Sequence, residues 1–175
     1  MQGVKQIERS VTIAAPAQAV WAVLADSERL PQWAPVVEDV SVAASAGGPV
    51  GEVRSCTARL SGKTGRMVER RVEYEPGARI AFVVVDESFG MRRMFDDYGF
   101  ALNLRARTDG RTDVVLQTHY TPRNAIYRLL NAAVLRRRLR AVCDELLDGL
   151  SHYTEALAKQ DTPARSGGVE RASAQ

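Results

Sequence analysis

The fold of this chain is decided by residues 11–35, which read VTIAAPAQAVWAVLADSERLPQWAP. From Val4 to Ile13, apolar and polar side chains alternate, which predicts a first strand. Pro16 suits the first turn of a helix, because the N–H that proline lacks would have no helical partner there. We therefore predict one helix over Pro16 to Ala25 and a second, short helix over Ser27 to Trp33.

Downstream of this segment the hydrophobic period changes to two, and turn residues interrupt it at short intervals. Gly and Pro cluster at 46–49, and an Asp-Gly pair stands at 109–110. Alternation between such turns indicates strands joined as hairpins, and hairpin connections make the strands antiparallel. With the N-terminal strand, the sheet has seven strands. The six that follow are predicted near 36–44, 50–60, 64–75, 78–87, 91–107 and 111–121.

The last ordered element is predicted to be one long helix from Arg123 to about Ala158. Its apolar residues recur at helical spacing and form a stripe along one side, which indicates packing against the sheet. From Lys159 to Gln175 the composition shifts to Ser, Gly, Pro, Ala and charged residues. Such a segment cannot bury enough apolar surface to become ordered. We expect one domain over residues 1–158 and a disordered tail over 159–175.

Composition places the chain among ordinary globular domains. Of its 175 residues, 45% are hydrophobic and 26% are charged, which excludes collagen, coiled coil and overall disorder. No apolar run reaches the roughly 18 residues of a membrane span, and the N-terminus lacks the apolar core of a secretory signal. Cys56 and Cys143 are too few for a disulfide framework. We therefore expect a cytoplasmic protein with two reduced thiols.

The spacing of residues within 11–35 also resembles that of a known family. Together with the order of elements that follows, it is similar to the START-like (SRPBCC) superfamily, of the polyketide cyclase/dehydrase and lipid-transport type. The resemblance covers about Val4 to Leu157. The residues that carry it are Val11-Thr12-Ile13-Ala14-Ala15-Pro16, Val20-Trp21, Leu24, Asp26, Pro31, Trp33 and Pro35.

The resemblance implies an α+β helix-grip fold. In that fold a seven-stranded antiparallel sheet wraps around a long C-terminal helix, and two short helices lie between strands 1 and 2. Members include lipid carriers, polyketide cyclases and hormone receptors, so the fold alone does not decide the activity. The composition agrees with the cavity of this fold. Only 6% of residues are aromatic, so the interior is incompletely filled, and an apolar ligand is the usual occupant of such a space.

Polar residues on otherwise apolar strand faces are the first candidates for a site in this cavity. Strict alternation over 91–107 puts Asp96 and Tyr98 on the same face as Met94 and Phe100. A buried carboxylate needs a partner or a raised pKa, so Asp96 is a candidate acid/base or ligand-orienting group. The alternative is that Asp96 lies at the open end of its strand, hydrated or paired with an arginine.

The same alternation over 64–75 puts Arg70 and Tyr74 on one face. Arg70 would meet Asp96 there, or bind an anionic or carbonyl-bearing ligand. A slip of register by one residue would instead expose Arg70. The candidate catalytic residues are Asp96, Tyr98 and Arg70. The predicted ligand-binding residues are Trp33, Val68, Arg70, Tyr74, Phe82, Met94, Asp96, Tyr98, Phe100, Leu116, Thr118, Leu130 and Val134.

Several catalytic signatures are missing from the sequence. It has no G-x-S-x-G elbow, no H-E-x-x-H and no G-x-G-x-x-G, and no metal-ligand spacing surrounds His119. We expect no metal and no cofactor. The leading hypothesis is binding of a small hydrophobic molecule, such as a lipid or polyketide. The alternatives are a polyketide cyclase/aromatase acting on a poly-β-ketone and a non-catalytic interaction protein.

Charge is segregated along the predicted final helix. Residues 123–140 hold six arginines and no acid, whereas residues 141–158 hold four acids and no Lys or Arg. The plain interpretation is a solvated face whose arginines pair with carboxylates of the sheet. Nucleic acid is not an expected partner, because aromatic platforms are lacking. The alternative is a patch for an anionic membrane surface or an acidic partner, formed by Arg136, Arg137, Arg138 and Arg140.

Overall fold

The computed structural model describes residues 5–43, 45–130 and 134–160. The seven predicted strands, the first helix and the short helical segment after it are confirmed, while residues 91–93 form a short helical turn instead of strand. In chain order the elements are β1 (Lys5–Ile13), α1 (Ala17–Ala25), η1 (Ser27–Arg29), α2 (Leu30–Trp33), β2 (Val37–Ala43), β3 (Val53–Leu60), β4 (Lys63–Glu75), β5 (Arg79–Glu87), η2 (Met91–Arg93), β6 (Phe95–Ala106), β7 (Thr112–Pro122), α3 (Ala125–Leu130) and α4 (Arg136–Gln160).

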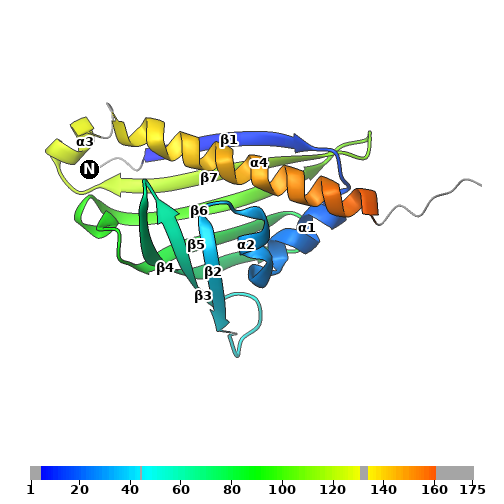
Figure 1. The fold of residues 1–175 in the computed structure, drawn as a ribbon, viewed down its shortest axis with the longest axis horizontal. Coiled ribbons are helices and arrows are strands. Elements are labelled where there is room, and N and C mark those ends of the chain that lie inside the picture. Colours follow the sequence, from blue (N-terminus) through cyan, green and yellow to red (C-terminus); the bar gives the residue numbers. More distant parts are fainter. Residues whose placement is uncertain (1–4, 44, 131–133, 161–175) are drawn as a thin grey trace, which may run out of the picture.

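The strands form one antiparallel sheet in the order β1-β7-β6-β5-β4-β3-β2. The sheet curls, and α4 lies across it along β1 and β7, while α1 and α2 cover one end (Figure 1). This is the predicted helix-grip architecture. None of the described helices combines the length and the apolar character needed to cross a membrane.

The β3–β4 hairpin sets the register of the strands that carry the site. Ser61 and Gly62 have φ angles of 51° and 78°, both positive, as a two-residue hairpin turn of the primed type requires. The turn therefore has two residues, and β4 begins directly after it at Lys63. It makes Arg54 the cross-strand partner of Glu69, so their side chains lie on the same face of the sheet.

A close contact between α2 and α4 positions one wall of the interior. At Gly149, a Cβ atom would stand 2.1 Å from the Trp33 carbonyl oxygen and 3.0 Å from Pro35 Cδ. No other residue type permits this approach of the helix to the backbone of α2. Gly149 therefore determines where the end of α2, and with it the Trp33 side chain, lies.

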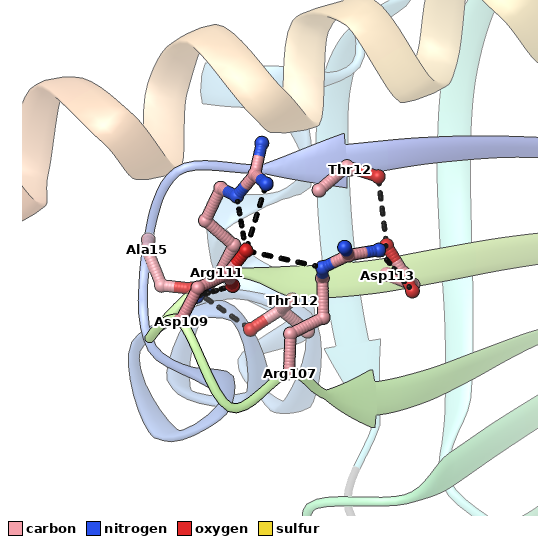
Figure 2. Close-up of polar contacts among 7 residues, drawn as sticks. All are labelled: Thr12, Ala15, Arg107, Asp109, Arg111, Thr112 and Asp113. Carbon is pink, nitrogen blue, oxygen red and sulfur yellow. Dashed lines mark hydrogen bonds and ion pairs between the residues drawn. The ribbon is translucent and has the colours of Figure 1, made fainter.

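Polar contacts around the β6–β7 turn connect the ends of these strands to β1 and to the segment before α1 (Figure 2). Arg111 donates to Asp109 at 2.7 Å, and this bond lowers the pKa of the Asp109 carboxyl to about 2. Asp113 accepts from the Thr12 hydroxyl at 2.7 Å, which connects β7 to the neighbouring β1. The buried Thr112 hydroxyl donates to the Ala15 carbonyl at 2.8 Å and fixes the start of the segment leading to α1.

The predicted single helix over 123–158 is divided. The structure has α3 and α4 in its place, with a π-type turn at 134–135 and with 131–133 outside the described residues. A π turn contains more residues than an α turn and so rotates the apolar stripe, which helical spacing alone cannot anticipate. Ile126, on α3, is 75% exposed. α4 continues to Gln160, and the rest of the predicted tail, 161–175, lies outside the described residues.

Candidate ligand-binding cavity

A cavity of about 500 Å³ lies between the inner face of the sheet and the N-terminal half of α4. Strands β3, β4, β6 and β7 form its floor, and α2 and the β5–β6 connection close its sides. Most of the side chains that line it are apolar. They include Leu30, Trp33, Val37, Cys56, Ala58, Met67, Phe89, Met91, Met94, Phe95, Phe100, Leu102, Leu116, Leu135, Leu139, Val142, Leu146 and Leu147.

A buried ion pair interrupts this apolar lining. The Arg54 Nε donates to Glu69 Oε2 at 2.6 Å, and the two residues are only 4% and 6% exposed. The Arg54 guanidinium carbon lies 3.8 Å from the centre of the Phe82 ring, so the cation is also stabilised by the aromatic face. Both charged side chains line the cavity. A charged pair on an apolar wall can orient a ligand, because it is the strongest polar feature there.

A second buried arginine, Arg71, also lies near the Phe82 ring. Its guanidinium carbon lies 5.4 Å from the centre of that ring, and the side chain pairs with Glu52 at 2.7 Å. It also donates to the Ser27 hydroxyl at 3.0 Å, which connects η1 to the sheet. Burial lowers the pKa of Arg71. Arg71 does not line the cavity, so its contacts are structural.

Two further polar side chains on the lining carry unused hydrogen-bonding groups. Trp33 is 8% exposed, and its Nε1 has no partner among the described residues. The Tyr98 hydroxyl likewise makes no hydrogen bond to the part of the chain that is described. Burial raises the pKa of Tyr98, so the phenol stays protonated at neutral pH and can donate. Both groups are therefore free to bind a ligand atom.

The two thiols of the cavity wall are not nucleophiles. Cys56 and Cys143 are buried and unpaired with each other. Burial raises the pKa of the Cys56 thiol to about 12 and also raises that of Cys143. Because the thiolate is the reactive form, both side chains act as small apolar groups at neutral pH.

Nearly half of the sequence-predicted ligand-binding residues lie on the cavity wall. β6 and β7 bring four of them together, while Trp33 comes from α2 and Met94 from the β5–β6 connection. The residues concerned are Trp33, Met94, Tyr98, Phe100, Leu116 and Thr118.

The predicted inward direction of Arg70 and Val68 is wrong. The register of β4 puts Met67 and Glu69 on the inner face, so Arg70 is exposed and Val68 lies outside the cavity. Alternation favoured the wrong set, because the inward set on this strand contains the two charged residues Glu69 and Arg71.

The predicted inward direction of Asp96 is also wrong. A β-bulge between Phe95 and Tyr98 breaks the alternation of β6, so Phe95 and Tyr98 face inward while Asp96 is exposed. Its carboxylate accepts from Arg123 Nε at 2.9 Å, which is the alternative arrangement considered from the sequence. Extra residues of this kind cannot be located from a period of two.

The remaining predicted residues have other positions. Phe82 is buried beneath Arg54 instead of lining the cavity. Tyr74 faces inward after a bulge in β4, but it packs on Trp21, with ring centres 5.1 Å apart. Val134, in the π-type turn before α4, is 40% exposed. The Leu130 side chain lies outside the described part of the chain.

Sequence reasoning missed Arg54 and Glu69. Strand 50–60 has small residues on both faces, so its hydrophobic pattern does not identify the inner one. The signal that could have found the pair is the turn at Ser61-Gly62. A two-residue hairpin at that point sets opposite charges directly across from each other, which is a favourable cross-strand arrangement.

A curved antiparallel sheet that encloses an apolar cavity against a C-terminal helix defines a START-like helix-grip protein. The family model for polyketide cyclase/dehydrase and lipid transport matches residues 5–155. The chain belongs to this family. No protein in a search of curated sequences matches it significantly.

Solved structures with the same fold include proteins of different description. The Zhui aromatase/cyclase from Streptomyces sp. R1128 has a TM-score of 0.69 at 21% identity, over 87% of this chain and 94% of that one. TTHA0849 from Thermus thermophilus has a TM-score of 0.71 at 22% identity, over 88% of this chain and 99% of that one. A START superfamily protein from Mycobacterium smegmatis has a TM-score of 0.66 at 16% identity, over 91% of this chain and 100% of that one. At these identities the likeness concerns the fold.

Proposed function

We propose that the protein binds one small, mainly apolar molecule, a lipid or polyketide-like compound, in the cavity beneath α4. The observation that carries this proposal is an apolar cavity of about 500 Å³ with a buried ion pair, Arg54–Glu69, on its wall. Small-molecule sites range from about 300 to 1,000 Å³ and combine apolar walls with a few polar groups that fix orientation.

The polar groups favour a ligand with acceptor oxygens, such as carbonyls or a carboxylate. Arg54 uses only its Nε for a hydrogen bond within the described residues, so its Nη groups are available to donate. Trp33 Nε1 and the Tyr98 hydroxyl add two further donors. A buried donor without an acceptor costs free energy that a ligand oxygen recovers. Affinity would come from apolar burial and orientation from these donors.

A cytoplasmic location remains part of the proposal. Cys56 and Cys143 are free, buried thiols, and free thiols are typical of a reducing compartment.

We predict that filling the cavity weakens ligand binding without unfolding the protein. Ala58 is buried on the lining, whereas Ala106 is exposed elsewhere on the sheet. The Ala58→Phe variant should bind dansyl-labelled undecanoic acid more weakly by about tenfold or more, because the ring occupies ligand space. Fluorescence titration measures the affinity.

Native mass spectrometry of the purified wild type should also reveal a co-purified small molecule.

The matched control is Ala106→Phe, which adds the same ring outside the cavity and should bind the probe like wild type. If Ala58→Phe retained wild-type affinity while its circular dichroism was unchanged, the probe would be binding elsewhere and the cavity assignment would be rejected.

A second candidate function is polyketide cyclisation, favoured by the side-by-side placement of a carboxylate and donors in one cavity. The Glu69 carboxylate could take a proton from a carbon between two carbonyls, leaving an enolate whose oxygen accepts from Arg54 and Tyr98. The enolate carbon would then attack a second carbonyl carbon of the same chain. Protonation of the resulting alkoxide by Glu69 returns the base to its starting state, so the step needs no oxidant or reductant.

If this chemistry occurs, Glu69→Gln should lower the rate constant for cyclisation of a poly-β-ketone analogue by about a hundredfold or more, because general-base catalysis contributes on that scale. Liquid chromatography of the cyclised product measures the rate. Asp96→Asn is the control, because Asp96 is exposed and outside the cavity. Equal loss in both variants, or product formation that Glu69→Gln leaves unchanged, would exclude the assignment of Glu69 as base.

A further inference from the structure

The outer side of α3 exposes apolar side chains that the fold does not use. Ile126 and Leu129 are 75% and 76% exposed, the highest values among the large hydrophobic residues of the described chain. They stand three positions apart on a helix and so share a face. Val134, just before α4, is 40% exposed. Isolated exposed apolar residues are common, but a pair on one helical face adjoining a charge cluster indicates an interaction surface.

Arginines without acidic partners among the described residues follow this pair along α3 and at the start of α4. Arg128 on α3 and the arginines at the start of α4 are exposed, and none of them has a salt bridge to a described acid. Most other arginines of the described chain do pair, as Arg9 does with Asp144 at 2.5 Å. Pairing with sheet carboxylates, the plain interpretation of the charge pattern, therefore holds for Arg123 but not for this cluster. We call the following residues the α3–α4 face: Ile126, Arg128, Leu129, Val134, Arg136, Arg137, Arg138 and Arg140.

The α3–α4 face adjoins the open end of the cavity. The exposed residues Ser61, Lys63 and Arg138 all line the cavity, so its wall reaches the surface there. Arg123, immediately before α3, donates its backbone N–H to the carbonyl of Met94, another lining residue, at 2.9 Å. α3, the start of α4 and the β5–β6 connection lie at the same end of the molecule (Figure 1).

We propose that the α3–α4 face docks on an anionic lipid bilayer and that the cavity exchanges its ligand with the bilayer there. Docking itself is independent of the proposed function, whereas ligand exchange rests on it. The arginines would bind headgroup phosphates, for which the planar guanidinium is well suited, and Ile126 and Leu129 would enter the boundary of the acyl chains. A stable protein partner needs about 800 Å² of complementary surface on each side, far more than two apolar side chains supply, whereas a bilayer needs no shape complementarity.

The test is flotation of the full chain with vesicles of phosphatidylcholine alone and of phosphatidylcholine mixed with phosphatidylglycerol. Binding is expected only to the mixed vesicles and should weaken as salt rises, because exposed charges are screened over about 10 Å at 0.1 M salt. Replacing Arg136, Arg137 and Arg140 together by Gln should lower the partition coefficient on the order of a hundredfold. Arg138 is left in place because it lines the cavity.

The charge-matched control replaces Arg70, Arg105 and Lys159 by Gln, three exposed cations away from the face, and should bind vesicles like wild type. Equal loss in the two triple variants would mean that net charge alone acts, and the docking face would be rejected. Equal binding to both kinds of vesicle, or to neither, would also overturn it. If the arginines bound free inorganic phosphate and the protein did not bind vesicles, the arginines would be assigned to a soluble anion and the docking face would be rejected.

The apolar part of the face has its own matched pair of variants. Ile126→Ser with Leu129→Ser should lower vesicle binding by about tenfold, whereas Val50→Ser with Val72→Ser, also exposed, should not. All variants should still bind dansyl-labelled undecanoic acid in solution, which separates this proposal from the proposed function. Transfer of that probe to vesicles should be faster when they contain phosphatidylglycerol. If the protein docked on vesicles but transferred the probe no faster to them, ligand exchange at the bilayer would be refuted. The assignment of the docking face would still hold.

Discussion

Replacing Glu69 by leucine is expected to lower the free energy of unfolding by about 3–5 kcal/mol, because it removes one partner of a buried ion pair. Arg54 would keep its charge at 4% exposure, and among the described residues only the Phe82 and Phe100 rings would remain near its guanidinium. Urea denaturation followed by tryptophan fluorescence measures the change. A loss below about 1 kcal/mol would mean that water in the cavity solvates Arg54, and the pair would not be buried in solution.

The double variant Arg54→Met with Glu69→Leu is the informative companion. Replacing both partners of a buried pair by apolar groups of similar size is often neutral or stabilising, so most of the stability should return. Binding of an acyl probe that carries a carboxylate should not return, because the donors that orient it are gone. Recovery of both properties would mean that the pair orients no ligand.

Gly149→Ala is expected to destabilise the protein by about 1–3 kcal/mol even though alanine is the better helix former. The added methyl group would stand 2.1 Å from the Trp33 carbonyl oxygen, so α2 or α4 must move. Because Trp33 is on the cavity wall, probe affinity should fall with stability. Thermal unfolding and fluorescence titration of the same sample measure both.

The control for Gly149→Ala is Ala156→Gly, at an exposed position of the same helix. At that position only the lower helix propensity of glycine matters, so the change should lower the free energy of unfolding by about 1 kcal/mol. If alanine proved stabilising at position 149 by a similar amount, the close approach of α2 to α4 would be contradicted.

The order and type of elements could be predicted from the sequence, because each depends on local patterns. Pro16 immediately precedes a helix, alternation marks strands, and Asp-Gly at 109–110 closes a hairpin whichever way the sheet packs. The predicted final helix was wrong in one respect. α3 ends at Leu130 and α4 begins at Arg136 after a π-type turn at 134–135, and such a turn leaves no periodic signal.

The site could be predicted only where a strand keeps strict alternation. β7 does so, and Leu116 and Thr118 face the cavity as predicted. β6 does not, and its bulge turns Asp96 outward. On β4 the inner set contains charges, so the hydrophobic pattern pointed to the opposite face and to Arg70.

The segment 11–35, together with the order of elements that follows it, predicted the family and the fold, because its proline, its apolar helix face and Trp33 indicate a strand followed by two short helices. Only the tertiary structure decided what that segment does in the interior. Trp33 reaches the cavity wall because Gly149, more than a hundred residues away, lets the two backbones touch. The polar centre of the cavity was likewise decided by pairing between strands, which brings Arg54 and Glu69 together. A single strand carries no information about its partner's register, so charges that meet across a hairpin become a site only when the sheet forms.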